Sequence, residues 1–221
     1  MTTTETLQRL YEQLLHAFGP QHWWPGDSPF EIAIGAILTQ NTNWTNVEKA
    51  INRIKAQHLM SAEALFHVPE VELAELIRPA GYFRLKTTRL KYFLTWLFER
   101  HQGDIERLKA MPWTSLREDL LGVKGIGPET ADSILLYALE QPTFVVDTYT
   151  ARMAVRHGLI EPPFDYHELQ ELFLSNLPPE VGLYNEYHAL IVALGKNYCK
   201  PTARCDHCPL HNHPHRLDAP D

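Results

Sequence analysis

Hydrophobic residues recur along most of the chain at intervals of three and four, the spacing of one face of an α-helix. The first such run extends from Leu7 to Phe18 and ends at Gly19-Pro20, a pair that stops a helix. Residues 30–38 are apolar almost all round, which indicates a helix buried in a core. The same spacing predicts further helices at 44–57, 61–66, 69–78, 83–101, 104–110, 113–122, 128–139, 148–158, 166–176 and 183–198.

No run of alternating polar and apolar residues is long enough to predict a sheet. We therefore expect an all-α fold of two lobes with a cleft between them. A chain of 221 residues with 44% apolar residues can bury a core of that kind. No apolar run reaches the length of a membrane span, and the N-terminus has neither a basic start nor an apolar stretch. We expect no membrane contact and a cytoplasmic protein.

The most informative segment is the run Leu120-Leu121-Gly122-Val123-Lys124-Gly125-Ile126-Gly127-Pro128-Glu129-Thr130-Ala131-Asp132. It predicts two helices joined by a tight turn, with Gly125 and Gly127 supplying backbone freedom. The glycines also let a phosphate approach the N–H groups at the start of the second helix, where the helix dipole is positive. Lys124 adds one charge. Such contacts position nucleic acid without reading its sequence.

The net charge of −7 argues against a surface covered in phosphate contacts. It still permits a local basic face. Such a cluster occurs at Arg78, Arg84, Lys86, Arg89 and Lys91, which form either a solvated helix face or a row of phosphate contacts.

The three cysteines, Cys199, Cys205 and Cys208, lie within ten residues of one another. An odd number of clustered cysteines in a chain without an export signal favours metal binding over disulfides.

The run of residues 120–132 resembles the helix-hairpin-helix of the endonuclease III superfamily of DNA glycosylases. In that family an apolar segment and an aspartate follow the hairpin, matched here by Phe144-Val145-Val146-Asp147-Thr148. Residues 37–42 resemble the family segment whose glutamine, here Gln40, fills the gap left by a flipped base. Residues 80–86 resemble the segment that supplies a wedge side chain, here Tyr82. The resemblance covers roughly residues 5–215.

This resemblance implies a three-part organisation of the chain. Residues 1–28 would form an N-terminal helix and loop packed with the C-terminal lobe. Residues 29–139 would form a central helical lobe that includes the hairpin at about 113–139. Residues 140–221 would hold the C-terminal helices and a metal loop at about 199–215.

The type of glycosylase depends on residue 129. Family members that also cut the strand carry a lysine there, whose amine attacks the sugar. This chain has Glu129, and a carboxylate cannot form an imine. We therefore expect a monofunctional DNA glycosylase, with Asp147 as the catalytic carboxylate and Glu129 either on the solvated surface or helping to hold water. The alternatives are a bifunctional lyase acting on oxidised pyrimidines and a non-catalytic DNA-binding module.

The base pocket resembles that of the endonuclease III-like 3-methyladenine DNA glycosylases. In those enzymes aromatic side chains from two segments line the pocket, and the corresponding residues here are Trp23, Trp24 and Trp44. A purine alkylated at N3 or N7 carries positive charge, so electron-rich rings attract it. The same tryptophans could instead be core residues.

The resemblance also implies partners and ligands. We expect a monomer that binds damaged double-stranded DNA in the nucleoid. The predicted phosphate contacts are Gly122, Lys124, Gly125, Gly127, Thr130, Arg84 and Lys86.

The cysteines match three of the four ligands of the family's [4Fe–4S] loop. The first spacing is one residue shorter, and Pro214 stands where the fourth cysteine would fall. We predict His213 as the fourth ligand, with His211 and His215 beside it. A zinc site and a loop without metal remain alternatives.

Overall fold

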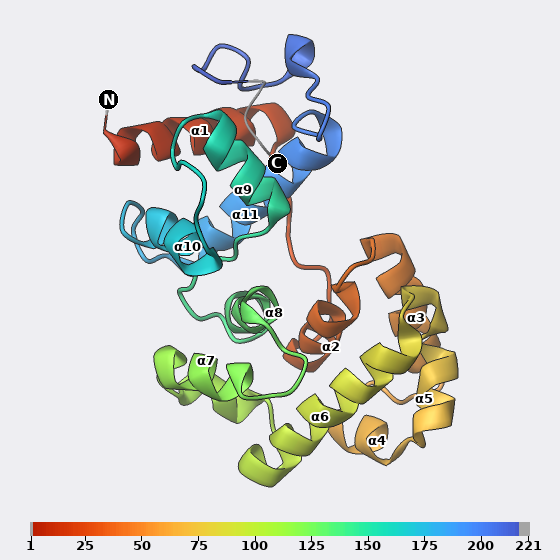
Figure 1. The fold of residues 1–221 in the computed structure, drawn as a ribbon. Helices are drawn as coiled ribbons and strands as arrows, with labels where there is room; N and C mark the ends of the chain where they lie inside the picture. Colours follow the sequence, from red (N-terminus) through yellow and green to blue (C-terminus); the bar gives the residue numbers. More distant parts are fainter. Residues whose placement is uncertain (1, 217–221) are drawn as a thin grey trace. The chain divides into compact units, whose positions relative to one another are not determined.

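The computed structural model describes residues 2–216 and divides the chain into two compact units (Figure 1). One unit runs from Trp24 to Gln141. The other combines the chain up to Trp23 with the chain from Pro142 onward.

The continuous unit is built around helix α2 (Pro29–Thr39), which packs against several neighbouring helices. Its residues from Ala33 to Leu38 are all buried, as expected from a segment that is apolar all round. Ser28 caps its first turn, and Pro29 occupies the first helical position. Around it lie α3 (Trp44–Ala56), α4 (Ala62–His67), α5 (Glu70–Leu76), η1 (Arg78–Ala80), α6 (Phe83–His101) and η2 (Glu106–Ala110).

The hairpin completes this unit (Figure 1). Helix α7 (Trp113–Leu121) precedes a turn of six residues, and α8 (Pro128–Ser133) follows it. The chain then continues as the π-helical segment η3 (Ile134–Ala138), which packs on α2.

The second unit joins the first helix of the chain to its last ones. Helix α1 (Thr3–Phe18) packs against α11 (Val181–Asn197), and the Tyr187 hydroxyl donates to the Leu7 carbonyl at 2.8 Å. Helix α9 (Thr148–Arg156) also packs on α11, and α10 (Tyr166–Leu174) and η4 (Cys205–His207) complete the unit. Phe144 and Phe173 stack at 4.2 Å between ring centroids in its core.

The predicted all-α fold is confirmed. Each predicted helical range is occupied, and most boundaries fall within two residues of the prediction. The range 104–110 differs in kind, because it forms a short 3₁₀ helix over Glu106–Ala110. No strand occurs between residues 2 and 216. None of the helices in this part of the chain has the length and apolar character of a membrane span.

Candidate active site

The turn between α7 and α8 is shaped by one glycine and pinned by two apolar side chains. Gly125 has a φ of +91°, a conformation that side chains with a Cβ rarely adopt. Val123 and Ile126 are each 5% exposed and belong to the core of the unit. A Cβ on Gly125 would lie 2.5 Å from Arg89 Cγ, so the arginine stem covers one side of the turn. The turn is therefore fixed before any ligand binds.

The first turn of α8 is open. Gly127 is its N-cap residue, and no side chain caps the helix. Beyond the neighbouring residues of the chain, no heavy atom of the described residues lies within 4 Å of the position where a Cβ of Gly127 would stand. Pro128 has no N–H, so the first backbone donors of this turn are those of Glu129 and Thr130. An anion can approach these N–H groups directly.

Two polar contacts brace the hairpin from inside. The Arg117 guanidinium donates two hydrogen bonds to the fully buried Asp132 carboxylate, at 2.7 and 2.9 Å, and so ties α7 to α8. The Gln40 amide donates to the Gly125 carbonyl at 3.1 Å and to the Thr130 hydroxyl at 2.9 Å. Arg89 in turn donates to the Gln40 oxygen. The Thr130 residue is buried, so its hydroxyl is engaged within the unit.

The basic residues of α6 do not form one exposed row, and the burial of Lys86 contradicts its prediction as a phosphate contact. Lys86 is 1% exposed, and its ammonium donates to the carbonyls of Leu38 and Ala80 at 2.7 and 2.8 Å. Burial lowers the pKa of Lys86 to about 8. Lys91 donates to three carbonyls at the end of α4. Arg84 is the cluster member on α6 that remains exposed.

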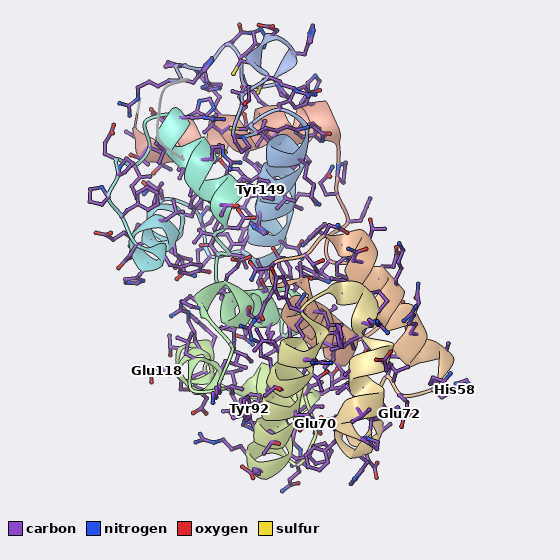
Figure 2. The ribbon with its side chains drawn as sticks, turned by 45° about the vertical axis from the view of Figure 1, so that its right-hand side comes forward. His58, Glu70, Glu72, Tyr92, Glu118 and Tyr149 are labelled. Carbon is purple, nitrogen blue, oxygen red and sulfur yellow. The ribbon has the colours of Figure 1, made fainter. Side chains whose placement is uncertain are left out.

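Large side chains project at the start of α6. Tyr82 is 69% exposed and has left-handed backbone angles, with φ of 45° and ψ of 30°. Leu85 is also exposed. Further along the helix, the Lys124 ammonium of the hairpin lies 5.4 Å from the ring centroid of Tyr92, which is labelled in Figure 2. These residues give the unit an exposed edge of aromatic and basic groups.

Asp147 follows the buried segment Phe144–Val146 and begins helix α9. Its Oδ1 accepts from the Thr150 N–H at 2.8 Å and from the Thr150 hydroxyl at 2.9 Å. Its Oδ2 lies 3.5 Å from His188 Nε2 on α11. Burial alone would raise the pKa of Asp147, but the contacts with His188 and Thr150 outweigh it and hold the pKa below its ordinary value. The carboxylate is thus an anion at neutral pH.

Trp24 and Trp44 form an aromatic group over Gly35 of α2. Their ring centroids are 5.2 Å apart with the planes nearly perpendicular, and both indoles lie about 3.5 Å from the position of a Gly35 Cβ. Tyr137 of η3 adds a third ring, 5.0 Å from Trp24. Trp23 lies in the other unit, where the Lys196 ammonium stands 5.7 Å from its ring. Its assignment to the pocket stays a prediction.

The three cysteines line one small cavity, together with His157, His211 and His215. Burial raises the pKa of Cys205 and of Cys208, and the neighbouring thiols add to the effect. The Arg156 guanidinium organises the loop by donating to Cys199 Sγ and to the carbonyls of Lys200 and Pro201. Between residues 2 and 216, no three His, Cys, Asp or Glu side chains are arranged to hold a metal ion.

His213 is not among the residues that line this cavity, and its assignment as the fourth ligand stays a prediction. Its side chain is buried and its ring faces His157 at 6.2 Å. His211 and His215 line the cavity instead. The Nδ1 atoms of these two rings lie 2.8 and 2.7 Å from backbone carbonyls, which leaves each Nε2 available to a metal.

Three residues that the sequence did not single out belong to these sites: His188, Tyr137 and Arg89. The first two lie in apolar helical runs, where a polar or aromatic residue is most simply explained as part of the core. The third was grouped with its basic neighbours. Their roles become visible only when helices that are distant in sequence come together.

Comparison with known proteins agrees with this geometry. A family model described as "HhH-GPD superfamily base excision DNA repair protein" matches residues 34–179. A protein of Methanocaldococcus jannaschii, provisionally named a DNA repair glycosylase, is 46% identical over 207 residues, or 93% of this chain and 94% of that protein.

Two solved structures show the same fold. The H. pylori 3-methyladenine DNA glycosylase bound to 1,N6-ethenoadenine is 30% identical, with a TM-score of 0.76, and the match covers 89% of this chain and 98% of that chain. A trapped endonuclease III–DNA covalent intermediate is 23% identical, with a TM-score of 0.81 and coverage of 95% and 94%.

Proposed function

Because the chain belongs to the HhH-GPD superfamily of base excision DNA repair proteins, as an endonuclease III-like DNA glycosylase, we propose that it removes alkylated purines such as 3-methyladenine without cutting the strand. The observation that carries the proposal is the residue on the first turn of α8, where Glu129 replaces the lysine of the strand-cutting enzymes. The nearest amine along the chain, that of Lys124, lies over the Tyr92 ring.

The hairpin would hold the DNA backbone. Its open first turn offers N–H groups to a phosphate, and the exposed Gly122, Lys124, Gly125 and Gly127 surround that approach. Tyr82, exposed on a left-handed backbone, would insert where a nucleotide leaves the stack, and Arg84 would contact a phosphate beside it. Gln40 is the proposed gap-filling residue and would exchange its contacts with the hairpin for contacts with the DNA.

Asp147 would carry the chemistry. In hydrolysis the bond between the sugar carbon C1′ and the base nitrogen breaks, and its electron pair leaves with the base. Water then bonds to C1′ and gives up a proton to solvent. Positive charge develops on the sugar between these events, and a fixed carboxylate stabilises it. An alkylated purine is a cationic leaving group, so one carboxylate suffices for this chemistry.

The aromatic group formed by Trp24, Trp44 and Tyr137 supports the choice of substrate. Electron-rich rings attract a cationic base more than a neutral one. The H. pylori structure, which is similar over most of both chains, is that of a 3-methyladenine DNA glycosylase. These two observations favour alkylated purines over oxidised pyrimidines.

The cysteine loop would hold a [4Fe–4S] cluster through Cys199, Cys205 and Cys208, with His211 or His215 as the fourth ligand. Three thiols and imidazoles lining one cavity are donors of the right kind for iron–sulfur, and also for zinc. When bound, the metal would join the thiolates and stabilise the loop. Iron, sulfide and zinc analysis of purified protein, with its visible spectrum, tests this; a protein without metal would refute it.

The proposed activity is tested by incubating purified protein with methylated DNA and identifying the released bases by chromatography. DNA with oxidised pyrimidines and undamaged DNA are the comparison substrates. We expect release of 3-methyladenine and little from the other two. Release of oxidised pyrimidines alone would overturn the substrate assignment, and binding without release would favour a non-catalytic module.

A further inference from the structure

The two oxygens of the Asp147 carboxylate have different partners. Oδ1 is occupied by Thr150, whose N–H and hydroxyl both donate to it within the first turn of α9. This contact is an ordinary helix cap. Oδ2 takes no part in the cap and lies 3.5 Å from Nε2 of His188. The second contact comes from a different helix, 41 positions further along the chain.

His188 is held firmly on α11. It is 5% exposed, and the residues around it on the helix, Tyr187 and Ala189 to Val192, are buried. The Tyr149 ring of α9, labelled in Figure 2, lies so close to Gly195 of α11 that an added Cβ would stand 2.2 Å from Tyr149 Cδ1. The two helices therefore approach closely, and their packing fixes the distance between His188 and Asp147.

We propose that His188 is a positioning residue for the catalytic carboxylate: it orients Oδ2 of Asp147 and keeps that carboxylate charged. The proposal rests on the proposed function, which makes Asp147 the catalytic carboxylate. His188 itself acts through Asp147.

The local electrostatics support this role. From α11 the titratable side chain of His188 contacts the Asp147 carboxylate, and from α9 Thr150 offers a neutral hydroxyl and an N–H. Together they keep the pKa of Asp147 below its ordinary value in spite of burial. A carboxylate of low pKa is a weak base but a stable anion. Asp147 is therefore suited to stabilising positive charge on the sugar and poorly suited to removing a proton from water.

The variants His188→Gln and His188→Phe test the role of this side chain. Glutamine keeps an N–H donor at a similar volume, whereas phenylalanine keeps a planar ring, somewhat larger than imidazole, and removes the donor. His167→Gln, at an exposed position of α10, is the matched control. Single-turnover release of 3-methyladenine is measured against pH, after subtraction of spontaneous loss, and 13C NMR of labelled aspartate follows the Asp147 carboxyl directly.

We expect His188→Phe to move the acidic limb of the rate profile and the Asp147 titration upward by at least about one pH unit, a tenfold change in the protonation equilibrium. His188→Gln should lie between wild type and His188→Phe, and His167→Gln should match wild type. Melting temperature and affinity for DNA with an abasic analogue check that the variants fold and bind.

Failure of the proposed function and failure of the His188 proposal give different results. If wild type releases no 3-methyladenine, the proposed function is wrong. If Asp147→Asn excises base as fast as wild type, the catalytic role proposed for Asp147 is wrong whatever His188 does. If Asp147→Asn is inactive while folded His188→Phe keeps the wild-type rate profile and Asp147 titration, the role of His188 alone is refuted.

Discussion

Helices α8 and α9 both begin with an acidic residue in or beside the first turn, yet their N-termini differ. At α8 the cap position is Gly127, no side chain caps the helix, and Glu129 in the first turn is exposed. At α9 the cap is Asp147 itself, with its carboxylate bound by Thr150 and His188. The positive end of a helix dipole is thus left without a side-chain cap in one case and holds a capping carboxylate in the other. The first arrangement suits a visiting phosphate, and the second suits a permanent charge.

We expect the largest effect on the excision rate from a substitution of Asp147, at the N-terminus of α9. Asp147→Asn retains a capping side chain but removes the charge, so α9 should still form while the sugar cation loses its stabilising partner. We expect single-turnover excision to fall by about 10²- to 10³-fold. DNA affinity should stay within a few-fold of wild type in a fluorescence anisotropy titration. Loss of binding together with rate would mean that the residue is structural.

Substitutions at Lys86 and Lys124 should affect different properties: the first protein stability, and the second DNA binding. Lys86→Met should lower the free energy of unfolding by about 2 kcal/mol, because the Leu38 and Ala80 carbonyls lose their donor. Lys124→Met, at an exposed position, should leave stability unchanged and weaken DNA binding. Urea unfolding and anisotropy measure the two effects, and a binding defect in Lys86→Met at normal stability would restore Lys86 as a phosphate contact.

The pH dependence of the unfolding free energy tests whether Lys86 is buried with a lowered pKa. Its pKa is about 8 in the folded protein and near the ordinary value of 10.5 in the unfolded chain. The unfolded chain therefore binds more protons between these values, and this group makes stability rise as pH rises from about 8 toward 10.5. The difference in unfolding free energy between wild type and Lys86→Met should grow over this window. A difference that stays constant would contradict the lowered pKa.

A substitution at Gly127 can give α8 a capping side chain like the one that Asp147 gives α9. Gly127→Asp places a charged cap where the phosphate is proposed to bind, and there is room for the side chain. We expect DNA affinity to fall by about tenfold, or 1.4 kcal/mol, while stability rises by a few tenths of a kcal/mol. Gly127→Asn adds a cap of similar size without charge and should weaken binding less. Equal losses would show that space, and not charge, governs the site.

The smallest effect is expected at Glu129. The side chain is exposed on α8, and substitutions at such positions change free energies by about 0.5 kcal/mol or less. Glu129→Gln should therefore change the excision rate by about twofold at most. A drop comparable to that of Asp147→Asn would instead give Glu129 a share in holding the attacking water.

The sequence predicts the helices well because each has its own local signal. Ser28 and Pro29 mark the start of α2, and the glycine-rich turn marks the hairpin. It fails for Lys86, since a lysine beside other basic residues has the pattern of a solvated face, and only the packed helices bring the Leu38 and Ala80 carbonyls to its ammonium. His188 has no local signal at all. The preference for His213 over His211 and His215 depended on loop spacing, which does not determine which ring faces the cavity.

Borohydride trapping tests the central claim, base excision without strand cleavage, most directly. Wild-type protein is incubated with duplex DNA containing one 3-methyladenine, with borohydride present or added afterwards. We predict that the base is released, that the strand stays intact until alkali cleaves the abasic site, and that no covalent protein–DNA adduct forms. A trapped adduct formed at the rate of base release would contradict the claim, because it would require an amine of this protein to attack the sugar.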